Sequence, residues 1–234
     1  MKDQRLAVLI DADNVPYSNI KEMLEEIAKN GTPTIKRIYA DWTKPTVSGW
    51  KNVLLEHAIT PIQQYSYAMD ILYSDKVDGF CIVSSDSDFT RLAIRLREAG
   101  MKVIGIGQKK TPQPFITACD KFVYIEILKM ESISESETTT QVKGKAKIQP
   151  KALNRIDQTL IKLLTESVAD LADESGWTFL GELGNFILKN KADFDPRNYG
   201  FPKLLPLIKS TKKFIIDERI AGNNNIRHIY LKVK

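Results

Sequence analysis

The sequence predicts an α/β fold class, with a mostly parallel sheet flanked by helices, plus a small winged-helix-like α+β domain. Three observations lead to it. Apolar runs alternate with amphipathic stretches through the first half of the chain, a polar stretch follows, and the last part shows three helical patterns and then two strand-like ones. With 234 residues, 43% hydrophobic and 27% charged, the chain has the composition of a globular protein with one or two cores.

The polar stretch divides the chain. Residues 129–151, KMESISESETTTQVKGKAKIQPK, are rich in Ser, Thr, Glu and Lys and poor in apolar residues, which is typical of a linker. We therefore predict a first domain over residues 1–128, a linker over 129–151 and a second domain over 152–234.

In the first domain, expected strands and helices alternate. The strands are expected over residues 5–10, 34–40, 61–66, 79–84, 102–107 and 122–128. The helices are expected over residues 18–30, 48–58 and 89–99, with a short one near 115–119. The first and fourth strands, RLAVLI and GFCIVS, are nearly continuous apolar runs, as in strands that a parallel sheet buries on both faces. Gly31 and Gly100 end two of the helices.

The second domain has the pattern of a winged helix. Helices are expected over residues 153–171, 180–189 and 199–210, and strands over 214–219 and 227–233. The sequence AGNNN between the two strands favours a hairpin loop, because these residues tolerate left-handed backbone.

The positive charge is concentrated in the second half. Residues 1–128 carry 16 Lys and Arg against 16 Asp and Glu, whereas residues 129–234 carry 18 against 13. This asymmetry indicates a polyanionic partner for the C-terminal part, although a net charge of +5 is also ordinary for solubility.

Two acidic motifs follow the two most hydrophobic strands. They are Asp11-Ala12-Asp13-Asn14 and Ser84-Ser85-Asp86-Ser87-Asp88. If the two strands are neighbours, Asp11, Asp86 and Asp88 converge outside their carboxyl ends, where open parallel sheets gather their chemistry. Close carboxylates need a proton or a cation between them, and oxygen ligands favour Mg²⁺ or Mn²⁺. Asp13 is a weaker ligand candidate, because alternate residues point in different directions. The competing interpretation is that Asp13, Asn14 and Asp88 cap helices.

The same residues resemble a known family. LIDADN, followed by IVSSDSDFTRLAIRLREAGMKVIGIG, resembles the NYN domain of the PIN-like nucleases, a group that includes LabA-like proteins. GWTFLGELGNFI, DPRNYGFPKLLPLI and IYLKVK resemble an OST-HTH (LOTUS) domain. The resemblance implies a PIN-like fold and a metal-dependent ribonuclease, or hydrolase of RNA phosphodiesters, joined to an RNA-binding module. It also implies that Asp11, Asp86 and Asp88 bind magnesium or manganese and that Asn14 and Ser84 support them as catalytic residues.

One departure from this family pattern lies near Tyr67 and Ala68. Domains of this kind usually have a longer stretch there, with an acidic residue that opens the next helix. Only 11 residues, 68–78, separate this point from the strand at Gly79, which is short for a parallel crossover. We therefore expect that a segment carrying the fourth acid is missing from this sequence.

A different acidic chemistry was considered for the first motif. Asp11-x-Asp13-x-Val15 also resembles the nucleophile loop of haloacid-dehalogenase-like phosphatases, which use a lysine before their last acidic motif. Only Lys76 lies closely before Asp86, within a turn-like sequence, so the nuclease interpretation is preferred.

Basic and aromatic side chains in both domains are candidates for RNA contact. They are Arg91, Lys109, Lys110, Tyr199, Lys203, Lys212, Lys213, Arg227 and Tyr230. Cations beside exposed rings suit single-stranded or structured RNA, whereas each tyrosine could instead belong to the core.

The sequence also bears on location and on competing functions. No transmembrane pattern is present, and two cysteines do not make a disulfide framework, so a cytoplasmic location without membrane association is expected. The alternatives to a ribonuclease are a non-catalytic RNA-binding adaptor or regulator, and a scaffold whose LOTUS domain binds a protein partner.

Overall fold

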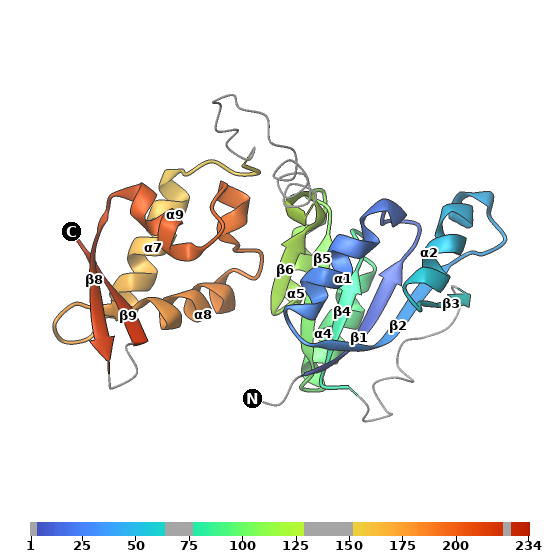
Figure 1. Ribbon diagram of the computed structural model, residues 1–234, viewed down its shortest axis with the longest axis horizontal. Helices are drawn as coiled ribbons and strands as arrows, with labels where there is room; N and C mark the ends of the chain where they lie inside the picture. Colours follow the sequence, from blue (N-terminus) through green and yellow to red (C-terminus); the bar gives the residue numbers. More distant parts are fainter. Residues whose placement is uncertain (1–3, 64–76, 129–151, 222–225) are drawn as a thin grey trace. The chain divides into compact units, whose positions relative to one another are not determined.

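A computed structural model describes residues 4–63, 77–128, 152–221 and 226–234 (Figure 1). The chain divides into two compact units, residues 1–144 and 145–234, and each has its own hydrophobic core. No helix in the described part of the chain is long and apolar enough to span a bilayer.

The first unit is built on a six-stranded sheet in which every neighbouring pair of strands is parallel. Its strands are β1 (Arg5–Asp11), β2 (Thr32–Ala40), β3 (Thr60–Gln63), β4 (Gly79–Val83), β5 (Lys102–Gly107) and β6 (Lys121–Tyr124). The order β3-β2-β1-β4-β5-β6 means that the chain winds outward from β1 and then returns to its other side at β4. The direction of winding therefore reverses between β1 and β4, the place where sheets of this kind bind ligands.

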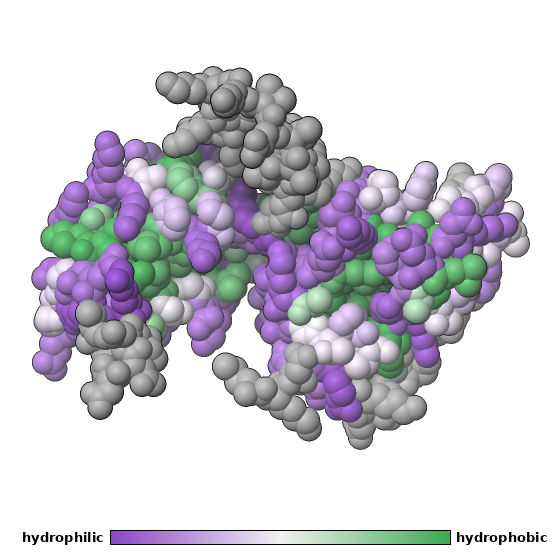
Figure 2. Space-filling model, in the orientation of Figure 1, coloured by the Kyte–Doolittle hydropathy of each residue, from purple (hydrophilic) through white to green (hydrophobic). Residues whose placement is uncertain are grey.

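Helices cover both faces of this sheet. They are α1 (Ile20–Ala28), α2 (Trp50–Glu56), α4 (Phe89–Glu98) and α5 (Gln113–Ala118), with 3-10 segments η1 (Tyr17–Asn19) and η2 (Pro45–Gly49). One face packs Val8 and Ile10 of β1 against Met23 of α1 and Trp50 of α2. This arrangement confirms the expected fold class. In the view of Figure 2, hydrophilic side chains cover much of the surface of this unit.

The last strand of the sheet is shorter than the sequence predicts. A strand to residue 128 was expected, but β6 ends at Tyr124 and residues 125–128 are helical. The reason is the length of its neighbour. Because β5 ends at Gly107, which pairs with Tyr124, the ladder offers no partner to the residues that follow. The expected missing segment near Tyr67 and Ala68 lies outside the described residues.

The second unit has three α-helices and a small antiparallel sheet, as expected for a winged helix. Its elements are α7 (Gln158–Asp170), β7 (Thr178–Phe179), α8 (Leu180–Asn190), η3 (Pro196–Tyr199), α9 (Leu204–Thr211), β8 (Phe214–Ala221) and β9 (Ile226–Val233). The strand order is β7-β9-β8, with β7 not foreseen from the sequence. Helix α7 begins later than expected because Asp157 caps it, accepting the Leu160 N–H at 2.9 Å.

Candidate active site at the carboxyl edge of the sheet

The two acidic motifs meet where β1 and β4 end. Because Ile10 pairs with Val83 in parallel register, the next residues, Asp11 and Ser84, lie side by side at the carboxyl edge of the sheet. The Ser84 hydroxyl donates to Asp11 Oδ2 at 2.7 Å, although the two residues are 73 positions apart. Asp11 is 7% exposed and Ser84 is fully buried. A buried hydrogen bond therefore joins the two motifs.

The Asp11 carboxylate is held by two further donors. The Asn14 amide donates to Oδ2 at 2.8 Å, and the Asp13 N–H donates to Oδ1 at 3.2 Å. Hydrogen bonds to an ionised acceptor are stronger than those between neutral groups, so three of them fix the orientation of this carboxylate. None of the ion pairs between described residues includes Asp11. Its negative charge therefore remains available to a bound cation.

The second motif continues the same network. Ser84 Oγ accepts the Asp86 N–H at 3.0 Å, and Asp86 Oδ1 accepts the Asp88 N–H at 3.0 Å. Asp86 is half-buried, whereas Asp88 and Asp13 are exposed. A chain of hydrogen bonds thus runs from Asp88 through Asp86 and Ser84 to the buried Asp11.

Helix capping does not account for these acids. The N-cap residues of η1 and α1 are Pro16 and Asn19, so neither Asp13 nor Asn14 is a cap. Asp88 is the N-cap residue of α4, but its side chain makes no capping hydrogen bond. Turn formation does account for Asp11 and Asp86, since each accepts the N–H of the residue two positions ahead.

A third strand also ends in an acid, which the sequence analysis missed. Asp41 directly follows β2, and the Thr43 hydroxyl and N–H donate to its Oδ1 at 2.7 and 3.2 Å. These two hydrogen bonds, the hydroxyl first, lower the pKa of Asp41. The Ala12 N–H donates to the Tyr39 carbonyl at 3.1 Å, which ties this strand end to that of β1. The rule that an acid follows an apolar strand does not find Asp41, because β2 contains Lys36 and Arg37 and is only partly buried.

The donor set fits a hard divalent cation by its chemistry, because every candidate ligand is a carboxylate, hydroxyl or amide oxygen. The described residues contain no group of three or more His, Cys, Asp or Glu side chains placed to hold a metal ion. Asp11, Asp86 and Asp88 therefore do not form a ready-made three-acid ligand cluster there, and their role as metal ligands stays a prediction. Lys76, which the phosphatase interpretation would need, lies outside the described residues.

The loop after β5 is fastened to the second motif. Ser85 Oγ accepts the Gln108 N–H at 2.8 Å, and the Lys109 N–H donates to Glu126 at 2.9 Å. Lys109 and Lys110 are exposed on this loop, and Arg91 is exposed in the first turns of α4. The three cations predicted to contact RNA in this unit therefore lie on elements that begin at the acidic edge. Ser85 and Glu126 were not singled out from the sequence.

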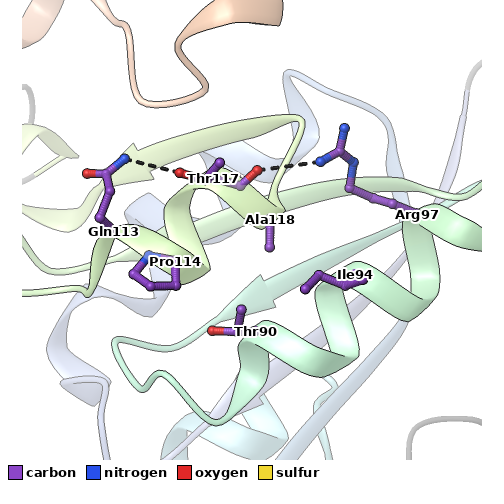
Figure 3. A pocket seen from close by; sticks show the side chains of 7 residues that line it. All are labelled: Thr90, Ile94, Arg97, Gln113, Pro114, Thr117 and Ala118. Carbon is purple, nitrogen blue, oxygen red and sulfur yellow. Dashed lines mark hydrogen bonds between the residues drawn. The ribbon is translucent and has the colours of Figure 1, made fainter.

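An apolar cleft of about 520 Å³ opens between α4 and α5 (Figure 3). It is lined by Thr90, Ile94, Arg97, Gln113, Pro114, Thr117 and Ala118. The Gln113 amide donates to the Thr117 hydroxyl at 3.3 Å, and Arg97 donates to the Thr117 carbonyl at 3.4 Å. No carboxylate lines the cleft, so it is separate in chemistry from the acidic edge.

The RNA-contact candidates of the second unit do not form one patch. Lys203 is exposed at the N-cap of α9, and Lys212 and Lys213 are exposed beyond its C-terminus. Arg227 pairs with residue 220 near the opposite end of the hairpin, and its Nη1 lies 3.8 Å from Oε2 of Glu218. Residue 220 lies seven residues along the strand from Lys213. Because a strand rises about 3.3 Å per residue, Arg227 is therefore about 23 Å from Lys213 along the hairpin.

The two tyrosines of this unit differ in exposure. Tyr199 is 8% exposed, packs in the core with its ring centroid 6.3 Å from that of Phe194, and has a pKa that burial raises. The ring of Tyr199 is therefore not available for stacking, and a contact between Tyr199 and RNA stays a prediction. Tyr230 is half-buried, and the guanidinium of Arg219 lies 4.2 Å from its ring centroid.

Family models match both units of the chain. The NYN domain model matches residues 5–126 and the OST-HTH/LOTUS domain model matches residues 151–226. An uncharacterized protein of Nitrosomonas europaea, with a solution NMR structure, is 28% identical over 41% of this chain and 90% of its own, with a TM-score of 0.33. A protein of unknown function from Vibrio parahaemolyticus is 20% identical over 53% of this chain and 93% of its own, with a TM-score of 0.43. No curated protein matches the chain. The chain belongs to the NYN domain family and carries an OST-HTH/LOTUS domain after its NYN domain.

Proposed function

We propose that this protein is a ribonuclease that hydrolyses RNA phosphodiesters with Mg²⁺ or Mn²⁺ at the carboxyl edge of the first sheet. NYN is a nuclease domain family, and OST-HTH/LOTUS domains bind RNA. The observation that carries the proposal is the buried bond between Ser84 and Asp11, which unites two acidic loops where the sheet reverses its winding.

Each residue of this edge has a role in the proposal. Asp11, Asp86 and Asp88 would hold the cation, with Asp13 as a weaker ligand, while Ser84 and Asn14 keep Asp11 in place. When bound, such a cation polarises the phosphate, activates water and stabilises the leaving oxygen. A P–O bond to the water oxygen would form, the P–O bond to the leaving oxygen would break, and a proton released by that water would pass to the leaving oxygen.

The cations of both units would supply affinity for RNA. Arg91, Lys109 and Lys110 would contact phosphates beside the acidic edge. The OST-HTH domain would add binding through its own basic side chains, and this contribution would weaken with salt because RNA releases counterions on binding. The cytoplasm, a reducing compartment, is the proposed location, since both cysteines are free thiols.

The proposal is tested by incubating a mixed RNA pool with the full chain in Mg²⁺, Mn²⁺ or EDTA. We expect cleavage with either cation and none in EDTA. Asp86→Asn should lower the rate by about 100-fold or more, because it removes a charge that acts on the transition state. Glu98→Gln is the matched control, since it removes an exposed charge at the far end of α4. Cleavage that persists in EDTA, or that Asp86→Asn leaves unchanged, would contradict the proposal.

A second candidate is a non-catalytic RNA-binding adaptor. It is favoured by the lack of a three-acid cluster among the described residues and by the hydrogen bonds that occupy Asp11 and one oxygen of Asp86. Salt-dependent RNA binding without cleavage in either cation would support this candidate. A chain that binds no RNA would instead fit a scaffold whose LOTUS domain binds a protein.

A further inference from the structure

Four lysines gather where α9 ends and the hairpin begins. We call Lys209, Lys212, Lys213 and Lys234 the lysine cluster. The Lys212 N–H donates to the Lys209 carbonyl at 3.3 Å, and the Lys234 N–H donates to the Lys213 carbonyl at 3.0 Å. All four are exposed, and none has an ion-pair partner in the part of the chain that the structure describes. The backbone thus brings four exposed lysines together at the junction of α9 and the hairpin.

The backbone at Lys212 is unfavourable for a lysine. Lys212 follows α9 with φ +56°, in the left-handed region, where a residue with a Cβ is sterically strained. Glycine is the usual residue at such a helix end, and this chain uses it at Gly100 after α4 and at Gly200 after η3. A glycine would therefore be the more stable choice at position 212.

The arrangement of Lys213 and Lys234 is also unfavourable. The antiparallel ladder pairs Phe214 with Val233, so Lys213 and Lys234 face each other on the next rung. Like charges directly opposite one another on two strands destabilise a sheet. The helix dipole of α9 favours a cation at its C-terminal end, but Lys209 already occupies that position, and the dipole gives no reason for Lys234.

A polyanion bound at the cluster would offset the repulsion between Lys213 and Lys234, and it would explain why the strained position 212 carries a lysine. No exposed aromatic ring belongs to it, since the neighbouring Phe214 is buried and Tyr230 lies under Arg219. Its chemistry therefore suits phosphates and offers no platform on which bases could stack. We infer that the lysine cluster is the surface with which the OST-HTH domain grips the RNA backbone, without reading the base sequence.

This inference rests on the proposed function only in naming RNA as the polyanion. The test uses the full chain in EDTA, so that binding is measured separately from cleavage. Labelled oligo(U) and oligo(A) are titrated over a range of salt concentrations with wild type, Lys212→Gly, Lys213→Gln and the control Lys189→Gln. Lys189 is exposed in the last turn of α8, away from the cluster in sequence and fold. Urea denaturation of the same variants gives their stability.

Lys212→Gly gives the sharpest result, because the two measurements should move in opposite directions. We expect it to raise stability while weakening binding by about threefold at moderate salt, with the slope of log K against log salt reduced by about one. Lys213→Gln should weaken binding equally, oligo(U) and oligo(A) should respond alike, and Lys189→Gln should bind as wild type.

Three outcomes would overturn the inference. The first is Lys212→Gly gaining stability with unchanged affinity. The second is Lys189→Gln losing as much affinity as the cluster variants. The third is that the full chain binds neither oligonucleotide but binds vesicles of anionic phospholipid when these are titrated in the same way. If the variants behave as expected but no cleavage occurs with Mg²⁺ or Mn²⁺, the inference stands and the nuclease proposal fails. If cleavage occurs and the cluster variants bind normally, only the inference fails.

Discussion

Ser84 holds the two acidic loops together, so its hydroxyl is the first group to test. It donates to Asp11 and accepts from the Asp86 N–H inside a fully buried position. Ser84→Ala leaves a buried carboxylate oxygen and an N–H without their partner, which we expect to cost about 1–3 kcal/mol in the free energy of unfolding. Urea denaturation measures this cost, and RNA cleavage should fall with it.

Ser87→Ala provides the comparison. Ser87 is exposed, and its hydroxyl lies 3.5 Å from Asp86 Oδ1, a distance at which little energy is at stake. We expect a change within about 0.5 kcal/mol. Equal effects of the two substitutions would mean that the buried hydrogen bond is not what holds the loops.

Individual residues also show what the sequence can and cannot predict about the site. Asp11, Ser84 and Asp86 were found because each follows an apolar strand, and parallel strands share one edge. The same rule does not reach Asp41, because the strand before it carries Lys36 and Arg37 and is not an apolar run. Tyr199 shows a different limit. Whether an aromatic ring is core or surface depends on tertiary partners such as Phe194, which no local pattern reveals.

At the scale of elements, the end of β5 must lie close to the acidic edge, and Gly107 makes this approach possible. A Cβ at Gly107 would lie 2.4 Å from the Ser84 carbonyl oxygen and 2.6 Å from Thr111 Oγ1. Gly107→Ala therefore has to displace the strand or the loop. We expect it to lower the free energy of unfolding by about 1–3 kcal/mol and to reduce RNA cleavage. Thermal unfolding and the RNA assay would measure the two effects.

The control for this prediction is a glycine with free space around it. Gly184 lies inside α8, and the nearest atom to a Cβ there is 3.6 Å away. Gly184→Ala should stabilise the second unit by about 0.5–1 kcal/mol, because alanine favours a helix. If Gly107→Ala were tolerated as well, the close approach of β5 to Ser84 would not be needed.

Elements were predicted best where one local signal dominates. Nearly continuous apolar runs predicted β1 and β4, as expected for strands that a parallel sheet buries on both faces. Strand ends that depend on the neighbouring strand of the sheet were not predicted. The end of β6 depends on where β5 stops, and β7 exists only because two residues pair with Leu231 and Tyr230 of β9. Such pairings are properties of the folded chain and leave no periodic trace in sequence.

For the whole molecule, two separate cores predict two separate unfolding reactions. Leu164 is fully buried in the core of the second unit. Leu164→Ala should lower the stability of that unit by about 2–5 kcal/mol, because it leaves a cavity. Calorimetry should show one transition moving to lower temperature while the transition of the first unit stays in place. A shared shift of both transitions would show that the units unfold together.

Because both cysteines are buried, their reaction with thiol reagents reports opening of the first unit. Cys81 lies in β4 and pairs with Val8 of β1, and Cys119 directly follows α5. Burial raises the pKa of Cys119 to about 12 and also raises the pKa of Cys81, so the reactive thiolate is scarce while the fold is closed. Both of the chain's cysteines belong to this unit. The labelling rate of Cys81 therefore measures how often β1 separates from β4, the two strands that precede the acidic motifs. It does not report unfolding of the OST-HTH domain.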